Sequence, residues 1–323
     1  MTRSPQHLQK IIAQVEALLE CEVFLVGGAV RDHLLNREVS DFDFTTAATP
    51  DYIESMLRRK NCKPYLVGKR YGTVGFKLPY GSDFTYVEIT TFREESYSPN
   101  SRQPVVNFAQ DLQVDLLRRD FTINAIAIGS GGAIIDTTGG QEDIKRRTLR
   151  CVGDPCIKFK EDPLRLLRAV RFAGALEFTL EEATSQALQS CTEELLTISW
   201  QRITQEMDTI MHLQNPVKSL QLLRSTGLLT MIIPELSLLT QKRYNQNLSE
   251  IEHAPKDAVD RRWRLFLQHT EIPYTTKPSA PLRRALLLKI CRQLQFSKAR
   301  TKVIISFWQP VSITLHWHYA TQI

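Results

Sequence analysis

Two short stretches decide the fold: residues 26–32, VGGAVRD, and residues 40–45, SDFDFT. Alternate side chains of an extended strand share a face, so Asp41 and Asp43 point to one side while Phe42 and Phe44 point to the other. Two carboxylates held this close repel each other unless a cation lies between them. Mg²⁺ suits the position because it prefers oxygen ligands and shares them with substrate phosphates. The preceding glycine turn lets backbone amides approach a triphosphate at the N-terminus of a helix.

An Asp-x-Asp pair in a strand also occurs as two solvated residues at a sheet edge. The glycine turn at this spacing favours the metal site instead. The turn has neither the Gly-x-Gly-x-x-Gly pattern of dinucleotide binding nor the Gly-Lys-Ser/Thr of a phosphate-binding loop. The pattern therefore indicates nucleotidyl transfer assisted by metal ions.

Composition sets the class of protein. A chain of 323 residues, 42% hydrophobic and 24% charged, is long enough for two or three units. No stretch approaches the roughly 18 apolar residues of a membrane span, and residues 1–5 lack an apolar signal segment, so we expect a cytoplasmic protein with no membrane partner. The six cysteines form no Cys-x-x-Cys pair, which argues against zinc and favours reduced structural thiols.

The net charge is +6, and the basic residues occur in clumps at 58–60, 145–147, 261–264 and 283–284. A single clump of this kind is commonly a solvated helix face. Several of them in a chain with a phosphate-directed site make a polynucleotide backbone a reasonable partner.

Hydrophobic spacing predicts a mixed α/β first part. Apolar residues at helical spacing predict a helix after Pro5, and Thr49 followed by Pro50 predicts the start of another that ends near Arg59. Strands are expected at residues 22–26, 73–78 and 84–91, and a polar, mobile loop at residues 93–103. From residue 162 onward the pattern is helical, with segments at 164–176, 181–191, 199–212 and 216–223. The predicted fold class is an α+β head with a mixed sheet, followed by an all-α remainder.

Two further stretches carry polar residues suited to nucleotide binding. In residues 118–125, RRDFTINA, we expect Asp120 and Asn124 on one face of a short helix beside two arginines. The alternative is a capped helix with exposed charge. In residues 161–165, EDPLR, we expect Asp162 and Arg165 to project together from the first helical turn, where they could match the edge of a base. The alternative there is an N-cap acid with a weak intrahelical ion pair.

As a set, these motifs resemble a known family. Residues 26–32 with the Asp-x-Asp pair, residues 118–125, residues 136–143 (DTTGGQED) and residues 161–172 (EDPLRLLRAVRF) are similar to the ordered motifs of class II tRNA nucleotidyltransferases. That family comprises the CCA-adding enzymes and their bacterial poly(A) polymerase relatives. The resemblance covers roughly residues 20–210. It implies a nucleotidyltransferase head at residues 1–150, a helical neck with a nucleotide-selecting template at 151–215, and a helical body with a reduced, tRNA-binding tail at 216–323.

The resemblance also implies roles for individual residues. Asp41 and Asp43 would be catalytic and hold two Mg²⁺ ions. The implied nucleotide-binding residues are Gly27, Gly28, Arg31, Arg118, Asp120, Asn124, Asp162, Arg165 and Arg168. Among these, Asp162 and Arg165 would pair with cytosine or adenine and reject guanine and uracil. The implied hinge contains Asp136, Gly140 and Asp143.

One motif departs from the family pattern. Residues 199–206, SWQRITQE, keep Arg202 and Glu206 but have Gln201 where the family usually has an acid. Because this motif braces the neck helices, the change concerns packing more than chemistry.

The resemblance implies an enzyme whose substrates are CTP, ATP and tRNA, and it leaves several products open. Residues 71–74 and 87–97 favour a CCA-type head over a poly(A) type, and the intact loop at 93–103 argues against CC-only addition. Complete CCA addition and A-only addition both remain. A catalytically silent RNA-binding protein on the same fold would require a damaged metal site or template, and neither is seen. The sequence leaves the oligomeric state open.

Overall fold

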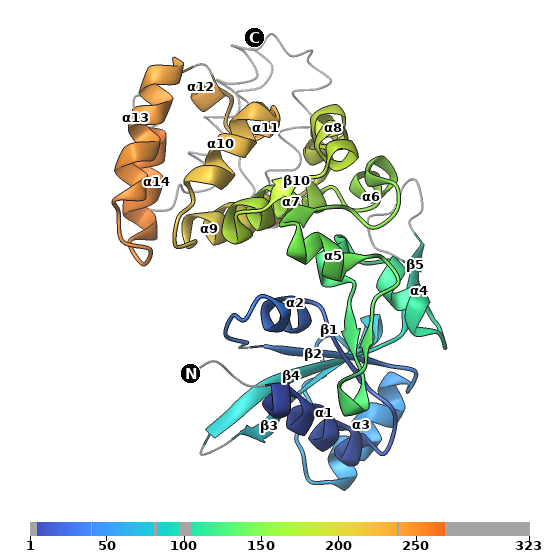
Figure 1. Ribbon diagram of the computed structural model, residues 1–323. Coiled ribbons are helices and arrows are strands. Elements are labelled where there is room, and N and C mark those ends of the chain that lie inside the picture. Colours follow the sequence, from blue (N-terminus) through green and yellow to red (C-terminus); the bar gives the residue numbers. More distant parts are fainter. Residues whose placement is uncertain (1–4, 40, 81–82, 97–104, 238, 269–323) are drawn as a thin grey trace, which may run out of the picture. The chain divides into compact units, whose positions relative to one another are not determined.

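The chain forms two compact units (Figure 1). The computed structural model describes residues 5–39, 41–80, 83–96, 105–237 and 239–268. The first unit comprises residues 1–162 and 178–184, and the second comprises residues 163–177 and 185–323. A mixed sheet with helices in the first unit and helices alone in the described part of the second confirm the predicted fold class. The three-part division at residues 150 and 215 stays a prediction.

A six-stranded sheet organises the first unit, with strand order β3, β4, β2, β1, β7, β8. The strands are β1 (Phe24–Val26), β2 (Phe42–Thr46), β3 (Thr73–Tyr80), β4 (Asp83–Thr91), β7 (Ala127–Ile128) and β8 (Ile134–Ile135). Strands β2 and β4 are parallel, and the other neighbours are antiparallel. The three strands predicted in this region are confirmed as β1, β3 and β4, with small shifts at their ends.

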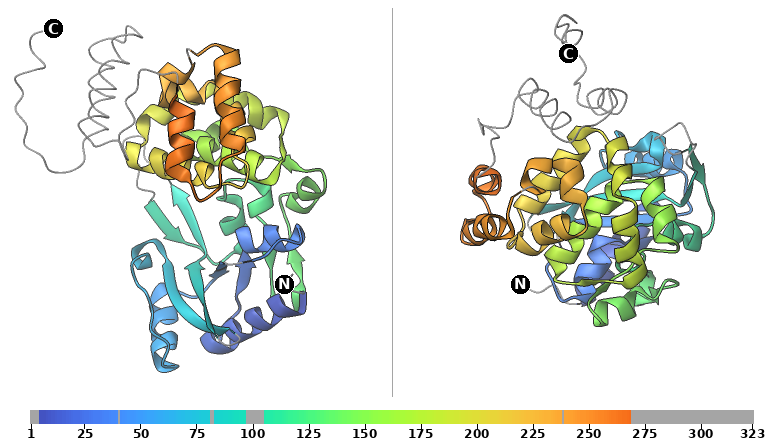
Figure 2. Two further views of the ribbon diagram at one scale, coloured as in Figure 1. Left: turned by 90° about the vertical axis from the view of Figure 1, so that its left-hand side faces the viewer. Right: turned by 90° about the horizontal axis from the view of Figure 1, so that it is seen from above.

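The two faces of the sheet differ in character. Phe42 and Phe44 of β2 are each 1% exposed, whereas Asp43 between them is exposed. Neighbouring strands repeat the pattern, since Phe76, Val87 and Ile89 are completely buried. Helices α1 (Pro5–Leu19) and α3 (Pro50–Arg59) lie on the buried side, and α2 (Gly28–Leu34) lies on the other (Figures 1 and 2). The strand alternation therefore puts Asp43 on the face opposite α1 and α3, which we call the open face.

Helices α1 and α3 begin where the sequence predicts, and α3 ends at the predicted Arg59. Five apolar residues of α1 are buried, namely Leu8, Ile11, Ile12, Val15 and Leu19. In α3 the Thr49 side chain accepts a hydrogen bond from the Tyr52 amide, and Pro50 occupies the first turn, where its missing N–H costs nothing. Burial of one apolar stripe on each helix fixes both against the sheet.

The polar loop predicted at residues 93–103 is wrong at its N-terminal end. Strand β5 (Arg93–Ser96) pairs with β6 (Val105–Phe108) in an antiparallel hairpin. The residues of β5 are polar and do not by themselves predict a strand, whereas its partner β6 carries the apolar Val106 and Phe108. Arg93 also donates a hydrogen bond to the Tyr71 carbonyl. The rest of the predicted loop, residues 97–104, lies outside the described residues.

The remaining elements of the first unit follow the sheet in sequence. They are α4 (Leu112–Leu117), the 3₁₀ turns η2 (Thr122–Asn124) and η3 (Ser130–Gly132), α5 (Gly140–Lys145), β9 (Thr148–Leu149), α6 (Pro155–Glu161) and β10 (Thr179–Leu180). A further 3₁₀ turn, η1 (Lys69–Tyr71), precedes β3. Strand β10 pairs in parallel with β9, which returns a short segment of chain to the first unit.

The second unit contains the helices that the sequence pattern predicts, and α8 begins in the first unit. The predicted segments correspond to α7 (Leu164–Leu176), α8 (Glu182–Ser190), α9 (Trp200–Met211) and α10 (Val217–Ser225). They are joined by η4 (Thr192–Thr197), α11 (Leu228–Ile232), α12 (Pro234–Ser237), α13 (Gln241–Glu252) and α14 (Val259–Leu267). Helices α7 and α10 approach so closely that a side chain at Gly174 would collide with Ser219. Among the described residues, no helix is both long and apolar enough to cross a bilayer.

One basic clump has a structural explanation that the sequence did not reveal. Arg262 of α14 is 1% exposed, and its guanidinium donates to backbone carbonyls. The acceptors are Ala254, Met211, Leu213 and Gln214, at donor–acceptor distances of 2.6–3.3 Å. Three of these carbonyls belong to the C-terminal end of α9 and the turn after it, where a positive charge is favourable. Arg262 therefore joins α9 to α14, and its inclusion in an RNA-facing clump is wrong.

Candidate nucleotidyl-transfer site

The two aspartates lie at the start of β2, which pairs in parallel with β4. Asp41 precedes β2, and Asp43 is placed opposite Glu88 of β4 by the strand register. Partial burial, Glu88 and Asp41 raise the pKa of the Asp43 carboxyl above its ordinary range, and Arg119 opposes them. The side chain still reaches solvent, so this crowding of negative charge is accessible to a cation from outside. Glu88 was not predicted as a site residue, and only the register of the strands identifies it.

The glycine turn brings the backbone next to this carboxylate. Gly27 follows β1 with a positive φ of 71° and is the N-cap of α2. A Cβ at this position would lie 3.3 Å from a guanidinium nitrogen of Arg119 and 3.8 Å from Asp43 Oδ2. A side chain would therefore crowd the Arg119 guanidinium and touch the Asp43 carboxylate, in a backbone conformation that favours glycine. Gly28 follows as the first residue of α2, with the guanidinium of Arg31 nearby.

A chain of side-chain hydrogen bonds links the second motif to the first. The Arg31 guanidinium donates two bonds to Asp32, at 2.8 and 2.9 Å, and a third to Asn124 Oδ1 at 2.9 Å. The Asn124 amide then donates to Asp120 Oδ1 at 3.0 Å. Both Asp120 and Asn124 are buried. The structure therefore brings together three predicted nucleotide-binding residues, and their role in binding stays a prediction.

The expected helix through residues 118–125 is wrong. Helix α4 ends at Leu117, Asp120 lies between elements, and Asn124 belongs to the 3₁₀ turn η2. The Asp120 carboxylate accepts a bond from the Phe121 amide, and its carbonyl accepts one from Val152. Because the Asp120 side chain and its own backbone anchor the turn, the two residues meet without sharing a helix face.

Arg118 and Arg119 are both held by a carboxylate that sequence reasoning missed. Asp115 of α4 is completely buried and accepts bonds from Arg118 Nε at 2.9 Å and Arg119 Nη2 at 3.0 Å. Burial alone would raise the pKa of Asp115, but Arg119 and Arg118 hold it below its ordinary value. The spacing of three and four residues on a helix was the available signal. This pairing holds Arg119 beside Gly27 and Asp43.

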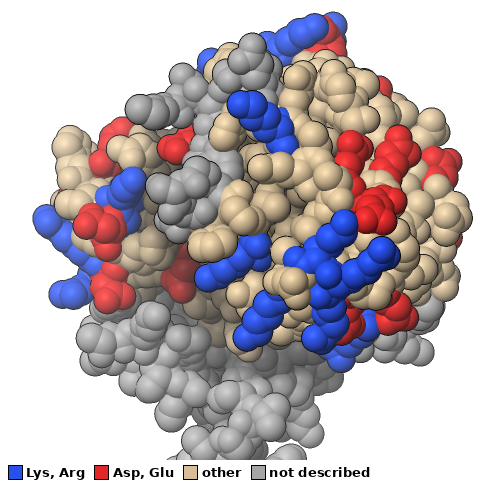
Figure 3. All heavy atoms as spheres, turned by 90° about the horizontal axis from the view of Figure 1, so that it is seen from below, with Lys and Arg blue, Asp and Glu red and all other residues tan. Residues whose placement is uncertain are grey.

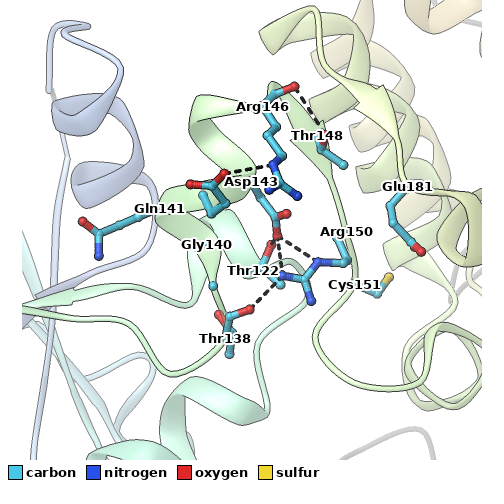
Figure 4. A network of polar contacts seen from close by, with 12 residues as sticks. Thr122, Thr138, Gly140, Gln141, Asp143, Arg146, Thr148, Arg150, Cys151 and Glu181 are labelled. Atoms are coloured by element: carbon cyan, nitrogen blue, oxygen red, sulfur yellow. Dashed lines mark hydrogen bonds and ion pairs between the residues drawn. The ribbon is translucent and has the colours of Figure 1, made fainter.

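The predicted hinge is a dense polar network (Figure 4). Asp136 accepts bonds from the amides of residues 138–141, so its carboxylate caps the start of α5. Asp143 accepts a 2.5 Å bond from the Thr122 hydroxyl and pairs with Arg150 at 2.8 Å. A side chain at Gly140 would collide with the Thr122 carbonyl. The network ties α5 to η2, and its hinge role stays a prediction.

The predicted template residues do not lie as expected. Asp162 is the C-cap of α6, with φ −138° and ψ 98°, and α7 begins only after Pro163. The residue before a proline is confined to extended conformations, which keeps Asp162 out of the first turn of α7. Arg165 is buried in α7, where Arg168 lies over the ring of Phe172 at 5.2 Å. Asp162 falls in the first compact unit and Arg165 and Arg168 in the second, so their joint role remains untested.

The neck motif with Gln201 keeps its ion pair. Glu206 of α9 accepts a 2.7 Å bond from Arg171 of α7, and both side chains are largely buried. Gln201 is exposed on α9. The departure from the family pattern therefore lies away from the contact between the two helices.

The exposed basic clumps are partly neutralised. Arg58 pairs with Glu54, Lys60 pairs with Glu20, and Arg146 pairs with Glu142. Figure 3 shows one face of the molecule, on which Lys and Arg side chains lie close to Asp and Glu side chains. Residues 283–284 lie outside the described part of the chain. The clumps therefore give weaker support for a polynucleotide partner than their sequence suggests.

The donor set at Asp41 and Asp43 fits a hard divalent cation. Both side chains offer carboxylate oxygens on an accessible surface, and their mutual repulsion is relieved by a bound cation. Within the described ranges, no group of three or more His, Cys, Asp and Glu side chains is arranged to hold a metal. Water and substrate phosphates would complete the ligand shell of an ion here.

Two family models match the chain. Residues 23–150 match the poly A polymerase head domain, and residues 177–239 match the probable RNA and SrmB-binding site of polymerase A. A CCA-adding enzyme of Geobacillus sp. (strain WCH70) is 40% identical over 248 residues, covering 74% of this chain and 59% of that protein. A CCA-adding enzyme of Lactobacillus helveticus (strain DPC 4571) is 47% identical over 186 residues, covering 57% of this chain and 45% of that protein.

Solved structures share the fold. The Bacillus stearothermophilus CCA-adding enzyme in complex with CTP matches with a TM-score of 0.64 and 28% identity, covering 94% of this chain and 78% of that one. A tRNA nucleotidyltransferase complexed with a primer tRNA and an incoming ATP analog matches with a TM-score of 0.66 and 24% identity, covering 92% and 94%. The chain spans less than two thirds of the length of the curated relatives it matches. On the two family models and these relatives together, the chain belongs to the family of class II tRNA nucleotidyltransferases and bacterial poly(A) polymerases.

Proposed function

We propose that this chain adds nucleotides to the 3′ end of tRNA, with complete CCA addition from CTP and ATP as the favoured reaction. The observation that carries the proposal is the Asp41 and Asp43 pair on an open sheet face, directly beside the glycine turn. The relatives at 40% and 47% identity support the CCA product because both are CCA-adding enzymes.

Each part of the site has a task in this reaction. Gly27 and Gly28 leave room for a triphosphate, and Arg31 and Arg118 supply positive charge near it. Asp120 and Asn124 select the ribose, while Asp162, Arg165 and Arg168 read the base. The 3′-hydroxyl of the RNA attacks the α-phosphate, and pyrophosphate leaves. Two Mg²⁺ ions bound by Asp41 and Asp43 would stabilise the attacking and leaving oxygens.

The test is incorporation of labelled CTP and ATP, singly and together, into a tRNA transcript that ends at its discriminator base, the single unpaired nucleotide to which CCA is added. We expect two CMP followed by one AMP, and Asp41→Ala should add none while still binding RNA. AMP addition only to a transcript ending in CC would indicate an A-adding enzyme, and long ATP-derived tails on unrelated RNA would indicate a poly(A) polymerase. Undiminished incorporation by Asp41→Ala would refute the carboxylate assignment.

The template role has a separate test. Arg165→Ala should relax the preference for CTP and ATP over GTP and UTP more than it weakens RNA binding, because a base-reading group is lost. The measurement is incorporation from each nucleotide alone. An unchanged preference would refute the assignment.

A further inference from the structure

A strip of aromatic side chains runs along the open face of the sheet, starting beside the carboxylates. Side chains two residues apart on a strand share a face, so Phe84, Tyr86 and Glu88 of β4 point the same way. Glu88 stands opposite Asp43 of β2, which puts these side chains on the face of the catalytic pair. We use the name aromatic strip for Tyr65, Phe84 and Tyr86.

The aromatic strip is accessible to solvent. Phe84 is 63% exposed, Tyr86 is 41% exposed and Tyr65 is 36% exposed. The intervening residue Val87 is completely buried on the opposite face. Large aromatic groups grouped on an accessible surface mark an interaction site more often than single exposed ones do.

Two contacts arrange the rings. The Tyr65 and Tyr86 ring centroids are 5.8 Å apart, with a tilt of 50° between the planes. The hydroxyl end of Tyr86 lies directly over Gly75 of β3, where any side chain would collide with it. Gly75 therefore leaves space for the Tyr86 ring to lie against the sheet and toward Tyr65.

A positive charge accompanies the rings. Lys77 of β3 stands opposite Tyr86 in the antiparallel register, so the two share a face, and Lys77 is exposed. Aromatic faces combined with a cation are the usual elements of a surface that binds single-stranded nucleic acid without reading its sequence.

We propose that the aromatic strip binds the unpaired 3′ tail of the RNA primer by stacking its bases. This inference rests on the proposed function, because a 3′-hydroxyl at Asp41 and Asp43 must be followed by the tail that carries it. The rise along β4 is roughly 3.4 Å per residue, so Tyr86 lies about 7 Å and Phe84 about 14 Å beyond Glu88. Stacked nucleotides on one strand are spaced by roughly 3.4 Å, so the strip begins about two nucleotides behind the reacting end.

Because of this spacing, the contact between the RNA tail and the aromatic strip depends on how many nucleotides have already been added. A transcript with one unpaired base does not reach the strip, whereas a transcript that ends in CC does. The strip therefore contributes most to the addition that follows CC. A protein partner on the same surface would show no dependence on the length of the RNA tail.

The experiment compares these two transcripts with four variants of the full chain. Phe84→Ala and Tyr86→Ala should raise the KM for the CC-ending transcript roughly tenfold, the effect of losing one stacked base, and should leave the KM for ATP unchanged. The KM for the transcript with one unpaired base should change much less. Phe84→Trp should restore binding because it restores a stacking surface. The control is Tyr52→Ala, an aromatic side chain on α3 whose exposed fraction, 39%, matches that of Tyr86.

A direct binding measurement tests the aromatic strip independently of the proposed nucleotide addition. The fluorescence of 2-aminopurine placed two nucleotides from the 3′ end should be quenched on binding to the original chain, and much less on binding to Tyr86→Ala. This readout needs no incorporation, so it applies even if the chain adds no nucleotide. Equal effects on both transcripts, or effects no larger than those of Tyr52→Ala, would overturn the proposal.

Discussion

Both units of the molecule bury a charged side chain, and they do so by different means. In the first unit, Asp115 is completely buried and is neutralised by Arg118 and Arg119. In the second unit, Arg262 is equally buried, but it donates its hydrogen bonds to the backbone carbonyls of residues 211, 213, 214 and 254. The ion pairs of Asp115 hold Arg119 beside Gly27 and Asp43, whereas Arg262 joins the ends of helices. The buried charge of the first unit therefore positions a residue of the candidate site, whereas that of the second unit holds two helices together.

Removing Asp115 should have the largest effect. Asp115→Ala leaves two arginines without their carboxylate, and breaking such a buried pair costs about 3–5 kcal/mol of stability. Incorporation per folded molecule should fall as well, because Arg119 is no longer held beside Asp43. Urea unfolding and single-turnover incorporation measure the two effects. The control is Asp111→Asn, which keeps an N-cap side chain on α4. Normal incorporation by folded Asp115→Ala would contradict the inference that Asp115 positions Arg119 for the reaction.

Removing Arg262 should affect stability alone. Arg262→Met leaves several buried carbonyls without a donor, at about 1–3 kcal/mol for each group that water cannot reach. Incorporation per folded molecule at low temperature should be unchanged, since no site residue contacts Arg262. Thermal unfolding and single-turnover incorporation are the measurements. Arg261→Met, at the exposed neighbour, should change neither. A selective loss of RNA binding by Arg262→Met would show that the guanidinium has a further role.

The third prediction concerns the pH dependence of the metal-free chain. The pKa of Asp43 is raised, so the folded chain holds this proton at pH values where the unfolded chain has lost it. Ionisation of Asp43 therefore lowers stability as pH rises from its ordinary pKa to its raised one, and the loss persists above that range. Asp43→Asn should make the metal-free chain more stable at neutral pH while abolishing incorporation. Urea unfolding with a chelator present checks the sign, and a less stable variant would contradict it.

The smallest effect is expected at the neck motif. Gln201 is exposed and lies away from the Arg171–Glu206 pair, so Gln201→Glu should change stability by no more than about 0.5 kcal/mol. Glu206→Gln, in contrast, should destabilise the contact between α7 and α9. Thermal unfolding of the two variants side by side compares them, and a large gain for Gln201→Glu would show that the family acid has a packing role here.

Local sequence signals predicted the elements, and long-range contacts explain the misses. Thr49 and Pro50 predicted the start of α3 because a cap acts within one turn. The alternation of Phe42, Asp43 and Phe44 predicted the two faces of β2 because it depends only on strand period. Glu88 was missed because its position opposite Asp43 depends on pairing between distant strands. Arg262 was misread because burial depends on helices that pack from elsewhere in the chain.

The prediction that Asp162 lies in the first turn of α7 was wrong for a local reason. Pro163 restricts the residue before it to extended conformations, so Asp162 and Arg165 do not share a helical turn although they are three positions apart. The hinge at residues 136–143 could be located from its motif, but its bonds to Thr122 and Arg150 could not.

The alternation of apolar and acidic side chains in β2 makes the fold intolerant of errors in strand pairing. A slip of one residue in the pairing of β2 would move Asp43 into the core and bring Phe42 and Phe44 to the surface. A chain with the wrong strand pairing would therefore lose its core along with its carboxylate site, and it would be removed as an unfolded protein. The same two phenylalanines that stabilise the sheet thus ensure that a molecule able to fold also presents Asp43 on the open face.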